Sequence, residues 1–488
     1  MMLPCIPLLA VLSVLPSPQT SELRGPMVKV PQVVEVRDSS VPAEGYRLAI
    51  ASNAVTVTAS DDAGLFYARE TLRQLQDADG RIPSGTVVDA PRYPFRCIHV
   101  DDGRHFFGKA NMLRTLELMA RYKLNWLVWH LAEDQGWRVQ IDRYPNLTTY
   151  GATRSRSVVR GRHKAVFDDR PYGPYFYTKD DIREIVARAK SLHIQILPEI
   201  EMPGHTRSIL AAYPELGCPS NPLDERSCWG EVGVCGDVVC AGNDDVLSFF
   251  RNVVDELCEL FPGPLISLGG DECRPTNAWH KCPRCRARMK ALGFTDVKQL
   301  QGWLTLQMID YVHDVKGRTF VGYSDIARTT EERADPKKVI ILGGCDNPAQ
   351  AYATLGYRVI GGPYEYCYFD FEQNAPDDPC VYASWWSGTV AVNTVCGFIP
   401  DLGMPDRFKK NVIGGVGYTW SEFTYTQAEF EWKLWPRAIA LAQALWHPIG
   451  GFDCNSMFLP AVKRHVEQLR REGVNAASLP VRSQQALW

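Results

Sequence analysis

The chain has 488 residues, of which 45% are hydrophobic, 22% charged and 11% aromatic, and its formal net charge is -3. This length favours one large domain with an accessory domain. The composition is that of a water-soluble globular protein, and the small net charge argues against a partner that is a nucleic acid or an anionic membrane.

The N-terminus carries an apolar run from Leu3 to Val14, followed by small and polar residues from Ser17 to Ser21. This run is as long as a signal peptide and too short to span a bilayer, although no Lys or Arg precedes it. We therefore expect residues 1–20 to be a signal peptide, and we expect no membrane span elsewhere in the chain. The expected location is the secretory pathway, with delivery outside the cell or to a lysosome-like compartment.

Fifteen cysteines fit an oxidising compartment. Removal of Cys5 with a signal peptide would leave an even number, which favours disulfides. The segment 282–285, Cys-Pro-Arg-Cys, lacks a second pair at ligand spacing, so a disulfide is favoured there over zinc. Asn146-Leu147-Thr148 is a glycosylation sequon, which fits a secreted glycoprotein. Four closely spaced cysteines predict a disulfide-bonded loop: Cys218, Cys228, Cys235 and Cys240.

Residues 22–92 predict a small α+β accessory domain. Alternation of apolar and polar residues predicts strands at 46–50 and 55–58. Residues 64–75 place apolar side chains on one face of a helix. The turn-forming segment 89–94 ends this domain.

Residues 93–488 show a different pattern, in which short apolar strands alternate with longer helical segments. This alternation is typical of βα units and a parallel sheet. Eight such units, followed by a C-terminal helix, predict an α/β fold, a (β/α)8 TIM barrel with the catalytic site. The expected strands are 97–100, 126–131, 194–198, 265–268, 319–322, 339–342, 358–360 and 412–418.

Polar residues follow most of these strands, at the end where this fold carries its active site. A solvated loop position explains any one carboxylate. It does not explain the whole set, in which acids, an Arg, a His and aromatic residues converge on one rim. Carboxylates with aromatic side chains and no basic stripe indicate a site for a neutral sugar rather than a phosphate.

Asp271 and Glu272 follow the fourth strand in the sequence Gly269-Gly270-Asp271-Glu272. Glycosidases usually place two carboxyl groups on either side of the scissile bond. Adjacent strand residues face opposite ways, so this pair is poorly placed to act as acid and nucleophile. If the 2-acetamido oxygen of the substrate attacks instead, Glu272 serves as general acid/base and Asp271 orients the acetamide.

Several motifs resemble those of glycoside hydrolase family 20, the β-N-acetylhexosaminidases. Gly-Gly-Asp-Glu at 269–272 resembles the family's catalytic signature, and residues 104–107, 129–138 and 198–206 resemble its motifs after the first three strands. The helix at 64–75 and Trp420-Ser421-Glu422 extend the resemblance over nearly all of the chain. It implies a retaining exo-glycosidase that removes terminal β-linked GlcNAc or GalNAc, with no metal and no organic cofactor.

The resemblance also implies roles for further residues. Arg104 would hold the sugar 3- and 4-hydroxyls through its guanidinium fork. Tyr368 would bind the acetamide oxygen, and Trp420 would lie under the ring. Glu201 and His205 would lie behind the acid and tune Glu272, while Asp370 and Glu422 would bind sugar hydroxyls. The expected substrate-binding set is Arg104, Glu133, Glu201, His205, Tyr368, Asp370, Trp420 and Glu422.

Four features depart from the family pattern. Glu133 and Glu201 stand where the family usually has Asp, and Ser267 stands where it has His. In the acetamide pocket, Tyr323 replaces one Trp, and Gly343-Gly344 leaves another Trp position empty. A wider or more polar pocket would admit an altered N-acyl group, unless Trp385 and Trp386 fold in as replacements.

These departures leave alternatives open. One is a carbohydrate-binding or weakly active relative, although the presence of Glu272 argues against it. Another is a conventional double-displacement glycosidase, which needs a second carboxylate about 5 Å from Glu272, such as Glu422 or Asp370. The expected partner is a glycan or amino-sugar oligosaccharide. The choice between GlcNAc and GalNAc, and between a monomer and a homo-oligomer, stays open.

Overall fold

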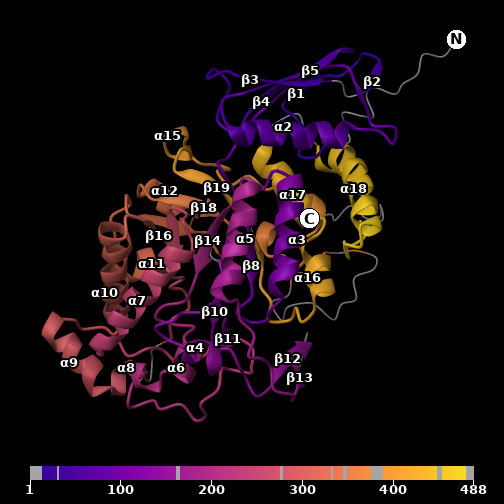
Figure 1. Cartoon of the computed structure of the whole chain (residues 1–488). Coiled ribbons are helices and arrows are strands. Elements are labelled where there is room, and N and C mark those ends of the chain that lie inside the picture. The colour runs from indigo at the N-terminus through magenta and orange to yellow at the C-terminus, as the bar shows by residue number, and fades with distance from the viewer. Residues whose placement is uncertain are drawn as a thin grey trace.

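A small N-terminal part and a large barrel make up the protein (Figure 1). Figure 1 shows the N-terminal sheet at one end of the barrel, with helix α2 (Asp62–Leu75) between the two. The computed structural model describes residues 14–29, 32–160, 165–274, 278–330, 333–344, 349–373, 375, 388–447 and 453–479.

The N-terminal part is a five-stranded sheet in the order β1-β7-β4-β5-β3, with a separate β2–β6 pair. Side chains of β4 alternate between buried and exposed, as expected for a sheet with one solvated face. Asp61 caps α2 by accepting a hydrogen bond from the Gly64 N–H. The strands are β1 (Thr20–Glu22), β2 (Met27–Lys29), β3 (Gln32–Arg37), β4 (Tyr46–Ile50), β5 (Ala54–Ala59), β6 (Arg81–Pro83) and β7 (Gly85–Asp89).

Residues before β1 are packed into the protein. Val14 and Leu15 are fully buried, and the Leu15 N–H donates to Gln74 Oε1 at 2.8 Å. The Ser17 N–H donates to Gln443 Oε1 at 2.7 Å. The boundary expected after residue 20 therefore falls inside the folded N-terminal part. The rest of the apolar run, residues 1–13, lies outside the described residues.

Eight parallel strands close into a barrel in the order β14-β15-β16-β17-β18-β19-β8-β9. This confirms the predicted TIM barrel, and each predicted strand is found with small shifts at its ends. Val, Ile and Leu side chains from these strands are buried on both faces, as a parallel sheet requires. The strands are β8 (Phe95–Asp101), β9 (Trp126–His130), β14 (Gln195–Glu199), β15 (Leu265–Ser267), β16 (Thr319–Tyr323), β17 (Val339–Leu342), β18 (Arg358–Gly361) and β19 (Val412–Thr419).

Helices surround the barrel (Figure 1). Helix α5 begins at a capping box, in which the side chains of Thr178 and Asp181 each bind the other's backbone N–H. No helix among the described residues is long and apolar enough to span a bilayer. The longer helices are α3 (Gly108–Arg121), α5 (Lys179–Ser191), α7 (Asp244–Leu260), α9 (Pro283–Leu292), α10 (Lys298–Asp310), α16 (Gln427–Leu434), α17 (Arg437–Trp446) and α18 (Leu459–Arg471).

Short elements fill the connections between these helices and strands. The strand pairs are β10 (Ala132–Glu133) with β11 (Gly136–Trp137), and β12 (Ser157–Arg160) with β13 (Val166–Asp168). The short helices are α4 (Asn146–Thr149), α6 (Arg207–Ala212), η1 (Pro214–Leu216), α8 (Ala278–Lys281), η2 (Tyr311–Val315), α11 (Asp325–Thr329), α12 (Ala349–Thr354), α13 (Tyr364–Cys367), α14 (Val392–Cys396), α15 (Asp406–Lys409) and η3 (Cys454–Phe458).

The cysteines differ from the prediction. Cys396 and Cys454 form a disulfide, whereas ten other described cysteines are free. The predicted disulfide-bonded loop at 218–240 is wrong, because its thiols face other groups. The Cys228 thiol lies 3.0 Å from the Gly151 carbonyl oxygen, and that of Cys235 lies 3.3 Å from Asp237 Oδ2. The disulfide expected at 282–285 is also not formed.

Candidate active site

The predicted site residues gather at the carboxyl end of the barrel. Figure 1 shows β10 and β11, which follow β9, at the end of the barrel away from the N-terminal sheet. The chain leaves each contributing strand there. Arg104 follows β8, Glu133 ends β10, Glu201 and His205 follow β14, Asp271 and Glu272 follow β15, Tyr368 and Asp370 follow β18, and Trp420 and Glu422 follow β19.

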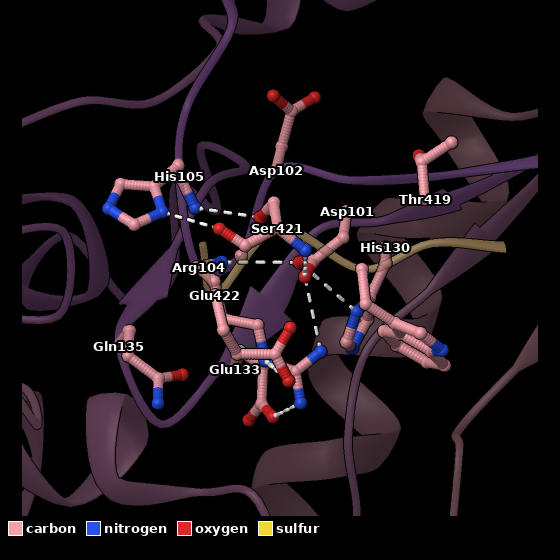
Figure 2. A network of polar contacts seen from close by, with 12 residues as sticks. Asp101, Asp102, Arg104, His105, His130, Glu133, Gln135, Thr419, Ser421 and Glu422 are labelled. Atoms are coloured by element: carbon pink, nitrogen blue, oxygen red, sulfur yellow. Dashed lines mark hydrogen bonds and ion pairs between the residues drawn. The ribbon is translucent and has the colours of Figure 1, made fainter. Parts of the chain in front are cut away.

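Arg104 is the central cation of the mouth (Figure 2). Its Nη1 donates to Asp101 Oδ2 at 3.1 Å, and its Nη2 forms an ion pair with Glu133. Its Nε lies 3.6 Å from Glu422 Oε1, and its Cζ lies 5.0 Å from the centre of the Trp420 ring. Burial lowers the pKa of Arg104, but the three carboxylates outweigh burial and raise it well above its ordinary value. The guanidinium is therefore permanently charged and held in one orientation.

His205 links Glu133 to the Asp271-Glu272 pair. Its Nδ1 lies 2.9 Å from Glu133 Oε1 and 3.4 Å from Asp134 Oδ2. Its Nε2 lies 3.7 Å from Glu272 Oε2 and 4.0 Å from Asp271 Oδ2. Burial lowers the pKa of His205, but Glu133 and Asp134 raise it well above the ordinary value. A cationic imidazole thus lies between the two acidic groups.

The backbone of this region is strained at two of these residues. His205 has φ 52° and Glu272 has φ 44°, both in the left-handed region that side chains rarely adopt. Such strain concentrates at functional sites, where the surrounding fold holds a side chain in a required direction. The strain is located at Glu272 and at His205, which contacts it.

Asp271 is a carboxyl group with a perturbed proton affinity. Burial raises its pKa well above the ordinary value, and the charges of Glu201 and Glu272 add to the increase while His205 opposes it. Its Oδ1 is buried without a hydrogen-bond partner among the described residues. Asp271 therefore offers an open acceptor of high basicity to a ligand N–H.

Glu201 lies behind the turn that carries the pair. Its Oε2 accepts from the Gly270 N–H at 3.3 Å, and its Oε1 lies 3.1 Å from His130 Nε2. A Cβ at Gly269, which has φ +56°, would lie 1.7 Å from Glu201 Oε2. The longer Glu side chain therefore reaches under a turn that only glycine can form. The negative charge of Glu201 raises the pKa of Asp271. The predicted influence on Glu272 would therefore act through Asp271.

Aromatic rings form a wall beside the carboxyl groups. Trp420 stacks on Tyr418 with ring centres 5.3 Å apart and planes at 5°, and Tyr368 lies 6.2 Å from Trp420. Asp370 comes two residues after Tyr368 in the sequence. Burial, followed by the charge of Glu422, raises the pKa of Asp370 to about 7. Its Oδ1 has no hydrogen-bond partner among the described residues, so it too is open to a ligand.

Two of the residues that depart from the family pattern, Ser267 and Tyr323, hydrogen-bond to the same carboxylate, Glu199. Ser267 Oγ donates to Glu199 Oε2 at 2.7 Å, and the Tyr323 hydroxyl donates to Glu199 Oε1 at 3.0 Å. A Cβ at Gly344 would lie 3.6 Å from the Tyr368 hydroxyl and 3.9 Å from Tyr323 Cδ1. Gly344 therefore borders the space between the two tyrosines. Trp385 and Trp386, considered above as replacements, lie outside the described residues.

Sequence reasoning assigned no role to Asp101, His99 and His130, which connect the two sides of the mouth. His130 Nδ1 lies 3.4 Å from Asp101 Oδ1, and its other nitrogen contacts Glu201. Burial lowers the pKa of His130, but Asp101 and Glu201 raise it well above the ordinary value. The available signal was the position of His99 and Asp101 two residues apart in an apolar strand, which places both on one face.

Several groups in the mouth have the spacing of metal ligands. In each, an imidazole nitrogen lies within 4.0 Å of a carboxylate oxygen, and Arg104 also pairs with Glu133. These carboxylates are therefore already in contact with imidazole or guanidinium groups. The groups are His99 with His130 and Glu199, Glu133 with Asp134 and His205, and His205 with Asp271 and Glu272. A fourth group, made of cysteines, lies outside this network.

Comparison with known proteins gives a consistent picture. The family model described as "Glycosyl hydrolase family 20, catalytic domain" matches residues 93–449, and "Glycosyl hydrolase family 20, domain 2" matches residues 12–90. The chain is 32% identical to a beta-hexosaminidase of Porphyromonas gingivalis over 430 residues, 85% of this chain and 52% of the relative. It is 31% identical to a beta-hexosaminidase of Akkermansia muciniphila, over 90% of this chain and 86% of the relative.

Solved structures agree with these matches. A mutant Streptomyces plicatus beta-hexosaminidase in complex with its product GlcNAc superposes with a TM-score of 0.80, 26% identity and 98% coverage of both chains. A Vibrio harveyi exo beta-N-acetylglucosaminidase bound to N-acetylglucosamine gives a TM-score of 0.83 at 25% identity, over 96% of this chain and 78% of that chain. The chain spans about half the length of the Porphyromonas relative, but nearly all of the Streptomyces structure.

Proposed function

Because the chain belongs to glycosyl hydrolase family 20, we propose that it hydrolyses terminal β-linked N-acetylhexosamine, GlcNAc or GalNAc, from glycans. The observation that carries this proposal is the placement of Asp271, Glu272 and His205 within one ion-pair cluster at the barrel mouth. The names of the relatives as beta-hexosaminidases, and the GlcNAc bound to a solved one, support the substrate class.

In the first step, the 2-acetamido oxygen of the substrate attacks the anomeric carbon, and the bond from that carbon to the leaving oxygen breaks. Glu272 transfers its proton to the leaving oxygen. Asp271 accepts a hydrogen bond from the acetamide N–H, which increases the nucleophilicity of the carbonyl oxygen. The raised pKa of Asp271 suits this role, because a more basic carboxylate polarises the N–H more strongly.

In the second step, water attacks the anomeric carbon of the cyclic oxazolinium ion, whose N–H stays hydrogen-bonded to Asp271. Glu272, now ionised, removes a proton from this water, and the bond from the anomeric carbon to the acetamido oxygen breaks. Two displacements at one carbon retain its configuration. His205 Nε2 lies 3.7 Å from Glu272 Oε2, so the imidazole stays beside the carboxyl group in both steps.

The remaining charged groups position the sugar. Arg104 presents guanidinium donors to hydroxyls, and its ion pairs with Asp101 and Glu133 prevent it from turning away. Asp370 and Glu422 offer acceptors on the other side of the ring. The Trp420 indole supplies an apolar surface for the sugar face.

The double-displacement alternative has weaker support. It requires a second carboxylate beside Glu272 that is free to bond carbon. The carboxylate that lies near the same His205 nitrogen, Nε2, as Glu272 is Asp271, its neighbour in sequence, while Glu422 faces Arg104. A binding protein without turnover is disfavoured because the proton donor and its imidazole partner are both present.

We also propose that the protein acts in the secretory pathway or outside the cell. The apolar N-terminal run and the sequon at 146–148 support this location. Expression of the full chain in a host of matching type, followed by N-terminal sequencing of protein from the medium, tests it. Full-length protein retained in the cytosol would contradict it.

Hydrolysis of three aryl glycosides tests the activity. We expect turnover of the N-acetylglucosaminide, the N-acetylgalactosaminide or both, and none of the plain glucoside, because only the first two carry the nucleophile. Cleavage of the glucoside would show an enzyme nucleophile instead. Saturable binding of N-acetylhexosamine without turnover would support the lectin-like alternative.

Glu272→Gln tests the acid assignment. We expect turnover to fall by about 100- to 10,000-fold with sugar binding retained, because the side chain can no longer donate its proton. The loss should be smaller for aryl leaving groups that need no protonation. Glu365→Gln is the matched control, since Glu365 is an exposed carboxylate near the same rim and should leave turnover unchanged.

A further inference from the structure

Four buried cysteines meet beside the active-site loops. The sulfur of Cys240 lies 3.7 Å from that of Cys282 and 3.7 Å from that of Cys285, and Cys218 lies 3.8 Å from Cys285. All four sulfurs lie within 4.8 Å of one another, and the side chains are at most 3% exposed. We propose that these cysteines, Cys218, Cys240, Cys282 and Cys285, bind one structural zinc ion.

The sulfur separations fit a tetrahedral zinc site. Structural zinc in proteins is bound by four ligands in a tetrahedron, with zinc–sulfur bonds of about 2.3 Å. A tetrahedron with such bonds has sulfur–sulfur edges of about 3.8 Å. The three closest edges here are 3.7, 3.7 and 3.8 Å. The described thiols are therefore spaced as four ligands of one ion.

The same spacing argues against two disulfides. A disulfide requires a sulfur–sulfur distance of about 2.05 Å, and each sulfur then has one partner. Cys240 instead has two equidistant neighbours, and so does Cys285. The contrast with Cys396 and Cys454 is direct, because these two cysteines of the same chain form a disulfide. The sequence pattern also changes its meaning, because the second ligand pair that 282–285 lacked comes from residues 218 and 240.

Close backbone packing brings the two pairs together. Cys218 and Cys240 lie in the long connection between β14 and α7, and the other two lie at the start of α9. A Cβ at Gly242 would lie 2.2 Å from the Arg284 carbonyl carbon, so only glycine permits this approach. The Trp279 indole N–H donates to the Val239 carbonyl at 2.9 Å.

Charge balance suits a bound cation. When zinc binds four thiols, four sulfur–zinc bonds form and four protons leave to solvent. The resulting centre carries two negative charges. Exposed basic side chains next to the Cys-Pro-Arg-Cys segment, Lys281, Arg284 and Arg286, partly offset them.

The site joins the loops that carry the catalytic groups. The connection after β14 also holds His205, and the connection after β15 holds Asp271 and Glu272. These loops touch near the acid, since a Cβ at Gly204 would lie 3.0 Å from Cys273 Cα. Zinc would link the loop after β14 to the loop after β15 at a second point, farther along the chain than the contact between Gly204 and Cys273. Its role is therefore positional, and it takes no part in bond cleavage.

Metal analysis of the purified full chain tests the proposal without any assay of turnover. After dialysis against a weak chelator, we expect about one zinc per chain by elemental analysis. X-ray absorption should show four sulfur neighbours at about 2.3 Å. Modification of the thiols with an organomercurial should release the metal to a colorimetric indicator. These readouts stay interpretable if the proposed glycosidase activity is not found.

Two single substitutions provide the matched comparison. Cys282→Ser should lower the zinc content to less than a tenth and lower the thermal midpoint. Cys228→Ser lies in the same loop region but outside the cluster, and its hydroxyl can still face the Gly151 carbonyl, so the zinc content should not change. Substoichiometric metal with four alkylatable thiols would overturn the proposal. Disulfides among these cysteines, or iron in place of zinc, would also overturn it.

Discussion

Two groups of buried charges lie at opposite ends of the barrel, and they differ in how completely they are paired. Under the N-terminal sheet, Lys123 Nζ donates to Asp89 Oδ2 at 3.0 Å and to the Tyr46 hydroxyl at 2.8 Å, and it lies 4.5 Å from the centre of the Trp446 ring. The Trp446 indole N–H donates to Asp89 Oδ1 at 2.8 Å. Each polar side-chain atom of this group has a partner.

The mouth group is left incomplete. Asp271 Oδ1, Asp370 Oδ1 and Arg104 Nε are buried without a hydrogen-bond partner among the described residues. An unpaired buried polar atom costs about 1–3 kcal/mol, so a fold does not retain several without a reason. The acetamide and hydroxyls of a sugar would supply the missing partners. The paired group around Lys123 therefore joins the two domains, whereas the incompletely paired group at the mouth is suited to bind a ligand.

The largest expected effect on stability comes from removing a charge from the fully paired group under the N-terminal sheet. Lys123→Met removes the cation that pairs with the buried Asp89 and leaves it only hydrogen-bond donors such as Tyr46 and Trp446, and we expect the free energy of unfolding to fall by about 3–5 kcal/mol. Turnover per folded molecule should not change. Denaturant titration with parallel kinetics measures both. Lys109→Met, which removes exposed ion pairs with Asp181 and Glu184, should have a much smaller effect, because solvent screens these charges.

A substitution in the mouth group should lower turnover and leave stability unchanged, the opposite of Lys123→Met. Asp271→Asn removes the proposed acceptor for the acetamide N–H, and we expect turnover to fall by about 100-fold or more. Stability should not fall, because the change removes a buried carboxyl group whose raised pKa makes its ionisation costly in the folded state. A loss of stability as large as that of Lys123→Met would contradict the distinction between the two groups.

Asp370 adds a pH dependence to this comparison. Its pKa is about 7 in the folded protein against an ordinary value of 3.8, so the unfolded chain loses this proton first. Ionisation therefore favours unfolding, and stability should decline from about pH 4 to about pH 7. Asp370→Asn should remove that part of the decline, by a few kcal/mol at most, since one pKa unit corresponds to about 1.4 kcal/mol. Thermal midpoints of both proteins from pH 4 to pH 8 test this, and parallel curves would contradict it.

The smallest effect concerns Glu199, a buried carboxylate of the mouth. Both of its oxygens accept a hydrogen bond, as both oxygens of Asp89 do in the group under the N-terminal sheet. Ser267→Ala removes one of its two hydroxyl donors, and we expect a loss of about 1–2 kcal/mol in stability. Tyr323→Phe removes the other donor and should cost a similar amount. A double-mutant cycle would show whether the two donors are coupled. Independent losses would argue against a single hydrogen-bonded set.

The barrel and its mouth were accessible from the sequence because both depend on local patterns. Apolar strands of three to eight residues alternate with helical segments, and acids follow the strands, so the strand ends gather the site in any such barrel. The interior link through His130 and Asp101 was not accessible in the same way. Both lie in apolar strands, and the pairing of β8 with β9 and of β9 with β14 brings them beside Glu201, which follows β14.

The sequence by itself determined the fold class, the order of the strands along the chain and the position of Asp271-Glu272 after the fourth strand, because these follow from hydrophobic periodicity and adjacency. Tertiary structure alone decided which charges meet. It placed Glu201 under the Gly269-Gly270 turn, and it completed the Cys-Pro-Arg-Cys segment with cysteines 42 and more residues away. Contacts between residues so distant in sequence depend on how loops pack above the barrel, and no local pattern encodes that packing.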